Sequence, residues 1–209
     1  MSKNVLCVVV ALVFALTALS AVLCGNANTA LADGKAQFKL DYHESFYASG
    51  KRKTRTCVLV NDDGSKLPHG KEVEWHEDGS IFAVRWYWKG RFHGIHQSFH
   101  QNGQLAASTE YIDGHAHGEH ASWHWTGKRH GRIWYEYDVL NGPAEYFDDN
   151  GVLTKKGCFL NGEADGEWSE YRPDGSVIRK GCYRKGKKIG TWVEYDVKGA
   201  EVGRVEYEK

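Results

Sequence analysis

The residues best suited to chemistry in this 209-residue chain are its histidines, which gather in one region. All eleven lie between residues 43 and 130, and eight of them lie between residues 93 and 130. Imidazole nitrogens bind transition metals, and an imidazole changes its charge close to neutral pH. The clustering therefore raises two hypotheses, a metal site and a protein that responds to acid.

The spacing of the histidines limits the metal hypothesis. Two sets of three recur at intervals of 24 residues: His69, His93 and His117, and His76, His100 and His124. If each interval is one hairpin, members of a set lie about 10 Å apart, too far to share one ion held at about 2 Å. A metal site would need neighbours from different sets, such as His96, His117 and His120. The pattern favours structural histidines at turns, with metal binding or pH sensing as alternatives.

Cysteines and carboxylates give no catalytic pattern. Cys57, Cys158 and Cys182 share one slot of the repeat. Equivalent strands would lie about 10 Å apart, whereas a disulfide needs Cα atoms within about 7 Å. We therefore predict that Cys158 and Cys182 are not bridged, and that all three act as half-buried apolar fillers. Nucleophile elbows, phosphate-binding loops and paired carboxylates are absent from the sequence, so we predict a protein that is not an enzyme.

The elements that must position these residues follow a 24-residue period. Two glycine series keep it: Gly70, Gly94, Gly118, Gly142, Gly166 and Gly190, and Gly79, Gly103, Gly127, Gly151, Gly175 and Gly199. Two aromatic series keep it as well: Trp75, Phe99, Trp123, Phe147, Tyr171 and Tyr195, and Tyr87, Tyr111, Tyr135, Phe159, Tyr183 and Tyr207. Turn signals such as Arg172-Pro173-Asp174-Gly175 separate short runs of strand-forming residues.

Each repeat is therefore predicted to be a β-hairpin followed by a tight link. Consecutive hairpins should pair side by side. The sequence thus predicts an all-β fold, an elongated single antiparallel sheet of stacked hairpins. If the two aromatic columns share a face, their rings would interleave into a ladder that forms the core.

The N-terminus is predicted to direct export. Lys3 precedes an apolar run over residues 5–23, and Ala30-Leu31-Ala32 fits a signal-peptidase site. An uncleaved anchor and a lipoprotein attached at Cys24 are the alternatives, and all three place the repeats outside the cytoplasm. The predicted organisation is a signal peptide at 1–32, a disordered lead-in at 33–40 and a repeat domain at 41–209. Its repeats are a degenerate cap at 41–69, then 70–93, 94–117, 118–141, 142–165, 166–189 and 190–209.

The composition points to a contact surface for proteins. Lys plus Arg and Asp plus Glu number 27 each, and this balance argues against non-specific nucleic-acid binding. Aromatic residues reach 13%, and tryptophan and tyrosine are favoured at contact hot spots. The candidate binding residues are the eight tryptophans: Trp75, Trp86, Trp88, Trp123, Trp125, Trp134, Trp168 and Trp192.

One repeat resembles a known family. The pattern Gly166-x-Trp168-x-x-Tyr171-x-x-Asp174-Gly175, followed by Tyr183-x-x-Gly186-x-x-x-Gly190, is similar to the MORN repeat in its bacterial variant. The resemblance implies a stacked-hairpin sheet used for protein–protein or membrane-lipid contact, with no catalytic residue and no cofactor. Bacterial members are often labelled as the antitoxin of a toxin–antitoxin pair, but an export signal fits a cytoplasmic antitoxin badly.

The favoured function is therefore an exported, non-catalytic scaffold or protein-interaction module of the cell envelope. Its expected partner is a protein of unknown identity, a membrane surface is possible, and nucleic acid is not expected. The alternatives are a His-rich metal-binding or pH-responsive envelope protein, a peripheral membrane-lipid binder and an antitoxin-like partner of a toxin.

Overall fold

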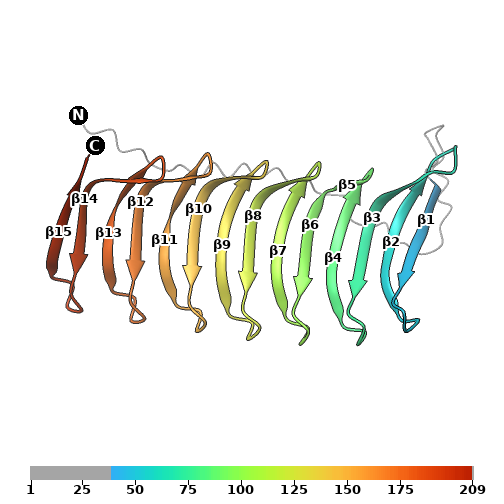
Figure 1. The fold of residues 1–209 in the computed structure, drawn as a ribbon, viewed down its shortest axis with the longest axis horizontal. Helices are drawn as coiled ribbons and strands as arrows, with labels where there is room; N and C mark the ends of the chain where they lie inside the picture. The colour runs from blue at the N-terminus through green and yellow to red at the C-terminus, as the bar shows by residue number, and fades with distance from the viewer. Residues whose placement is uncertain (1–38, 209) are drawn as a thin grey trace, which may run out of the picture. The chain divides into compact units, whose positions relative to one another are not determined.

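The computed structural model describes residues 39–208, which form a single open antiparallel sheet (Figure 1). Each strand pairs with the next along the chain, and only the short β5 lies off this path, against β4. The predicted fold class is confirmed.

The predicted signal peptide lies outside the described residues, and within them no helix is long and apolar enough to cross a membrane. The strands are β1 (Lys39–Phe46), β2 (Arg52–Val60), β3 (Lys66–Trp75), β4 (Ile81–Trp88), β5 (Arg91–Phe92), β6 (Gly94–Phe99), β7 (Leu105–Ile112), β8 (His115–Trp123), β9 (Arg129–Glu136), β10 (Val139–Phe147), β11 (Leu153–Leu160), β12 (Glu163–Tyr171), β13 (Val177–Arg184), β14 (Lys187–Tyr195) and β15 (Glu201–Tyr207).

The first hairpin, β1–β2, corresponds to the predicted cap repeat. β1 begins at Lys39, two residues before the predicted start of the repeats, because Lys39 and Leu40 pair with Val60 and Leu59. Residues 33–38 of the predicted lead-in lie outside the described part of the chain.

Two kinds of turn set the 24-residue period. At the hairpin tip, Gly175 takes a φ of 83°, and the carboxylate of Asp174 accepts a hydrogen bond from the Ser176 amide at 2.8 Å. At the link, Lys185 and Gly186 both have positive φ, of 49° and 72°. Two consecutive positive φ values define the two-residue turn whose twist matches that of the strands it joins. Local turn chemistry therefore determines where each strand ends.

The link of the third repeat keeps this turn without glycine. Tyr137 and Asp138 take φ values of 47° and 67°. The Asp138 carboxylate accepts hydrogen bonds from the Ala116 amide at 2.7 Å and from His115 Nδ1 at 2.6 Å. These bonds compensate for a positive φ, which residues other than glycine, asparagine and aspartate seldom adopt.

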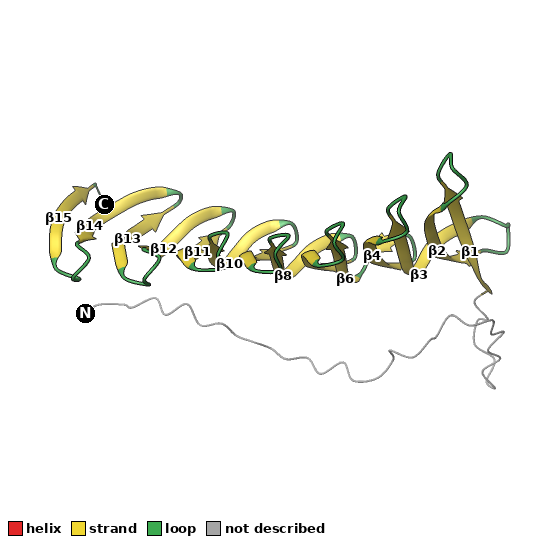
Figure 2. Cartoon of the chain, turned by 90° about the horizontal axis from the view of Figure 1, so that it is seen from below, coloured by secondary structure: helices red, strands yellow, loops and turns green. Residues whose placement is uncertain are grey.

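Bulges recur in every repeat and bend the sheet. In the fifth repeat the strand register shifts between Glu170 and Tyr171, and again between Lys180 and Cys182. Such bulges bend a strand and increase its twist. The strands are accordingly bowed in Figure 1, and the view from below shows that the sheet curls along its length (Figure 2).

The sheet has two unlike faces, because successive side chains of a strand point to opposite sides. We call the face that carries Trp168, Tyr183 and their equivalents the ladder face. The other, which carries Lys156, Tyr171 and their equivalents, is the open face. The core lies on the ladder face, where rings meet edge to face: Phe159 with Trp168 at 5.3 Å, Trp168 with Tyr183 at 6.0 Å, and Tyr183 with Trp192 at 5.1 Å between centroids.

The two aromatic columns considered in the sequence lie on opposite faces, so they do not interleave. Tyr171 lies on the open face, with Lys156 Nζ at 5.6 Å from its ring, whereas Tyr183 packs on Trp168. Tyr171 follows Trp168 by three residues, an odd step, and an odd step along a strand reverses the side-chain direction. The ladder therefore consists of the series of Phe159 and Tyr183, alternating with Trp168 and Trp192.

Each indole of the core lies directly over a glycine of the preceding repeat. A Cβ atom on Gly157 would lie 2.1 Å from Cδ2 of Trp168, and one on Gly181 would lie 2.4 Å from Cδ2 of Trp192. The indole nitrogens of both tryptophans donate hydrogen bonds to backbone oxygens, of Cys158 and Cys182, at 3.1 Å each. The large ring and the missing side chain therefore form one packing unit.

The same two slots hold complementary pairs elsewhere in the array. Thr56 donates to Glu72 at 2.6 Å, and Thr109 bonds to His120 at 2.7 Å. A side chain of medium size here faces one of medium size, whereas glycine faces tryptophan. Where Glu72 or His120 takes the place of tryptophan, the residue opposite is therefore threonine and not glycine.

The structure has no disulfide between any two of Cys57, Cys158 and Cys182, and only Cys158 is half-buried as all three were predicted to be. Their shared slot is not equally covered along the array: Cys57 is buried, Cys158 is intermediate and Cys182 is exposed. Burial raises the pKa of the Cys182 thiol, with Glu167 and Asp165 adding to the effect, so the thiolate is disfavoured there.

Candidate binding surfaces

The structure distributes the eight candidate tryptophans over both faces and one turn. Trp168 and Trp192 are buried in the ladder, at 3% and 4% exposure. Trp125 is 69% exposed in the turn between β8 and β9. Trp86 and Trp88 are exposed on the open face of β4. The remaining three are half-buried, and each lies beneath an arginine: Trp75 with Arg52, Trp123 with Arg129, and Trp134 with Arg132.

Four exposed apolar side chains lie on three neighbouring strands, β3, β4 and β6. They are Leu67, Trp86, Trp88 and Ile95, with exposures of 39%, 44%, 49% and 54%. The ring of His69 packs 4.6 Å from that of Trp88 and supports it from the side. We call these four residues the Trp86–Trp88 patch. It is the place where the structure brings two candidate tryptophans together at the surface.

The ladder face of the first repeat is polar instead of aromatic. Arg85 Nη1 lies 2.9 Å from Glu72 and 2.8 Å from Glu74, and all three side chains are at most one quarter exposed. The Tyr87 hydroxyl donates to Glu72 at 3.3 Å, and burial raises the pKa of Tyr87 to about 12. Each charged group therefore has a partner of opposite sign, which is the pattern of a structural network.

Two of the three candidate metal ligands are directed to other partners. His96 Nε2 lies 2.8 Å from the carbonyl oxygen of Trp86, and His120 Nδ1 lies 2.7 Å from the Thr109 hydroxyl. His117 Nδ1 is buried without a hydrogen bond to any described residue. Between residues 39 and 208, no group of three His, Cys, Asp or Glu side chains is placed to hold a metal ion.

The residue that directly follows the first aromatic series (Trp75, Phe99 and their equivalents) connects neighbouring repeats. This role was not predicted from the sequence. In three repeats its side chain hydrogen-bonds to the backbone oxygen of the aromatic residue in the next repeat, whereas the buried Nε2 atoms of His76 and His124 have no such bond. The pairs are Tyr47 with Trp75 (2.7 Å), His100 with Trp123 (2.9 Å) and Arg172 with Tyr195. The signal in the sequence was the recurrence of hydrogen-bonding residues at this slot, which includes the column of His76, His100 and His124.

Comparison with known proteins agrees with this geometry. The MORN repeat variant family matches residues 92–113, 140–161 and 164–185. Three repeats of this chain are therefore MORN-variant repeats. Each matched segment contains one hairpin tip and ends at the first residue of a link, and the match at 164–185 covers most of β12 and β13. Of the Trp86–Trp88 patch, Ile95 lies in a matched segment, whereas its other three residues and the polar network lie outside the matched segments.

No curated protein matches the sequence. Among solved structures, a protein with unknown function from Bacteroides fragilis NCTC 9343 is similar at 10% identity. The similarity covers 71% of this chain and 95% of that chain, with a TM-score of 0.17.

The half-buried histidines make the stability of the sheet depend on pH. Burial lowers the pKa of His120 from 6.5, so the folded state disfavours the protonated ring. The contribution of His120 to stability is full above about pH 6.5 and is lost as the pH falls from there through its lower folded-state pKa.

We expect His120→Gln to reduce the loss of stability between about pH 7.5 and about pH 5.5, measured by urea unfolding. His43→Gln, at an exposed position of β1, is the control and should keep the wild-type pH dependence. A wild-type pH dependence in His120→Gln would contradict the assignment.

Proposed function

We propose that this protein is an exported, non-catalytic MORN-repeat protein that serves as a protein-interaction or scaffold module of the cell envelope. The observation that carries the proposal is the Trp86–Trp88 patch, four exposed apolar side chains on adjacent strands. Contiguous exposed apolar surface marks interaction sites, and tryptophan is the residue most enriched at binding hot spots.

The architecture supports a contact role because it holds the patch on a rigid element. Trp86 and Trp88 lie on β4, which is paired on one side with β3 and on the other with β6. The polar network of Arg85, Glu72 and Glu74 fixes the opposite face of the same strands. A partner would therefore meet side chains whose backbone is already ordered, which lowers the entropic cost of binding.

The non-catalytic part of the proposal is supported by the way the charged groups of the ladder face are paired. Arg85 bridges Glu72 and Glu74, and Arg179 holds both oxygens of Glu170 at 2.7 and 3.0 Å. Carboxylates paired with arginine in this way are typical of structural ion pairs. The export part is supported by the signal-like features of residues 1–32, which make an envelope protein the expected class of partner.

We expect a photoreactive amino acid at position 88 to crosslink to one discrete envelope protein in living cells. Trp86→Ala in the same chain should reduce the yield by at least about tenfold, because truncating a hot-spot residue costs about 2 kcal/mol or more. Crosslinking is read out by a mass shift on a denaturing gel and by identification of the adduct.

Trp125 provides the matched control, because it is an exposed tryptophan in a turn outside the patch. A photoreactive residue at position 125 should give no discrete adduct, and Trp125→Ala should leave crosslinking from position 88 unchanged. Equal adducts from both positions would contradict a specific surface. Adducts with lipid alone would favour a peripheral membrane role, which liposome flotation with and without anionic lipid would then test.

A further inference from the structure

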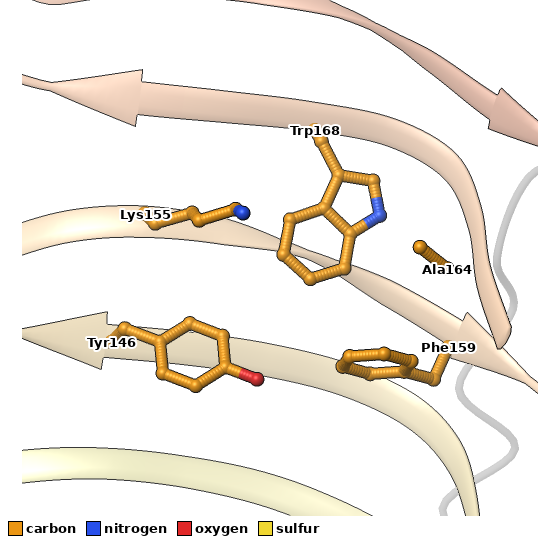
Figure 3. Close-up of a pocket in the computed structure, with 5 residues that line it drawn as sticks. All are labelled: Tyr146, Lys155, Phe159, Ala164 and Trp168. Atoms are coloured by element: carbon orange, nitrogen blue, oxygen red, sulfur yellow. The ribbon is translucent and has the colours of Figure 1, made fainter. Parts of the chain in front are cut away.

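A hollow lies on the ladder face of the fourth and fifth repeats, well separated along the sheet from the Trp86–Trp88 patch. Its lining consists of Tyr146, Lys155, Phe159, Ala164 and Trp168 (Figure 3). Ala164 leaves room for the hollow: among the equivalent slots of other repeats, Ala116 is equally small, whereas Phe92, Leu140 and Lys188 are larger.

The ammonium group of Lys155 borders this hollow without a counter-charge. Lys155 Nζ lies 4.9 Å from the ring centroid of Trp168, and Figure 3 shows the side chain directed toward that ring. Its cross-strand neighbour on β12 is Glu170, but both oxygens of that carboxylate are held by Arg179. Within residues 39–208, Lys155 therefore has no carboxylate within ion-pairing distance.

A second donor borders the hollow from the other side. Tyr146 lies directly opposite Lys155 in the pairing of β10 with β11. Burial raises the pKa of Tyr146, so its hydroxyl keeps its proton at neutral pH. The hydroxyl makes no hydrogen bond to a described residue, and in Figure 3 it points toward Phe159 along the floor of the hollow.

The walls are aromatic and stand at a steep angle to each other. The rings of Phe159 and Trp168 meet edge to face, with 82° between their planes. A flat ring can therefore pack against the half-buried Phe159 and lie next to the rim of the buried Trp168 indole. Two donors, one of them a full positive charge, border the same space, and an anionic group of single charge complements them.

We propose that this hollow binds a free small aromatic monocarboxylate of the arylacetate type. The ring of the ligand packs against the half-buried Phe159, next to the buried indole of Trp168, and its carboxylate accepts hydrogen bonds from Lys155 and Tyr146. Because Glu170 lies next to Lys155, a ligand of higher negative charge is disfavoured. The site is independent of the proposed contact role, since no residue of the hollow belongs to the Trp86–Trp88 patch.

Phenylacetate is the probe that tests the site. In a titration of the isotope-labelled repeat protein, the indole N–H signal of Trp168 is expected to shift saturably, with a dissociation constant on the order of 1 mM. The signal is assigned from its disappearance in Trp168→Phe. 2-Phenylethanol, which keeps the ring but lacks the charge, and hexanoate, which keeps the charge but lacks the ring, should each bind about tenfold more weakly or worse.

Adjacent lysines on opposite faces provide a matched pair of variants. Lys155→Met should weaken phenylacetate binding at least about tenfold, Lys155→Arg should retain it, and Tyr146→Phe should weaken it several-fold. Lys156→Met removes the same charge one residue away, over Tyr171 on the open face, and should leave binding unchanged. The Lys156 variant thus controls for long-range charge.

Three results would overturn the site. They are the absence of a saturable shift, equal weakening by Lys155→Met and Lys156→Met, and binding of 2-phenylethanol as tight as that of phenylacetate. Trp86→Ala should bind phenylacetate as the wild type does, so a failure of the proposed contact role and a failure of this site give different results.

Discussion

Gly157→Ala is expected to destabilise the C-terminal repeats by about 3 kcal/mol, the upper end of the range for overpacked cores. The added Cβ would lie 2.1, 2.3 and 2.5 Å from Cδ2, Cε2 and Cγ of Trp168. The ring cannot move away easily, because its nitrogen is bonded to the Cys158 oxygen and Phe159 packs against it. Gly157 does not have a positive φ, so the penalty comes from the collision and not from backbone strain. Urea unfolding followed by tryptophan fluorescence measures the loss.

Gly203→Ala is the matched control for this change. Gly203 also lies on a strand without a positive φ, and its nearest neighbour would be the flexible Glu194 carboxylate at 3.3 Å. Its effect should be within about 1 kcal/mol, because a flexible side chain can move aside and alanine restricts the unfolded chain. Equal stability of Gly157→Ala and Gly203→Ala would show that the packing of Trp168 does not require glycine at position 157.

A compensating exchange tests the packing rule itself. Gly157→Thr alone should be at least as damaging as Gly157→Ala, for the same reason. Adding Trp168→His recreates the pairing of Thr109 with His120, which are joined at 2.7 Å elsewhere in the array. The double variant should therefore be more stable than Gly157→Thr alone, a non-additivity expected only for residues in contact.

Trp192→Ala is expected to cost about 3–5 kcal/mol, as truncations of large buried aromatic residues do. The side chain is 4% exposed, packs edge to face with Tyr183 and donates to the Cys182 oxygen. Trp125→Ala removes the same atoms at a site that is 69% exposed and should change stability by no more than about 0.5 kcal/mol. Comparable losses in the two variants would show that burial in the ladder does not determine the contribution.

The damage from Trp192→Ala should stay local. Each repeat contacts its sequence neighbours and not more distant repeats, so the stability of an array is a sum of repeat and nearest-neighbour terms. Hydrogen exchange should therefore accelerate in β13, β14 and β15 and remain near wild-type rates in β2, β3 and β4. Uniform acceleration along the sheet would instead indicate a single cooperative unit.

The candidate sites could be anticipated only in part. The eight tryptophans were recognisable as conspicuous residues, but the sequence did not separate buried Trp168 from exposed Trp88. Because side chains alternate along a strand, the three-residue spacing could have predicted that Trp168 and Tyr171 lie on opposite faces. The hollow at Lys155 had no signal of its own, because it depends on the pairing of Glu170 with Arg179 and on the small side chain of Ala164.

The sequence by itself determined the repeat length, the hairpins and their order in the sheet. The physical reason is that turns are local: a residue such as Gly175 or Gly186 selects its backbone conformation from its immediate neighbours. Antiparallel pairing then follows from hairpins that succeed one another without a crossover.

Only the tertiary structure decided which rings form the core, which tryptophans reach the surface and which charges lack a partner. Those outcomes depend on neighbours across strands, such as Gly157 with Trp168, and on bulges that shift the pairing within each repeat. A side chain in a sheet packs against residues of the adjoining strands, whose relative register is fixed only when the strands pair.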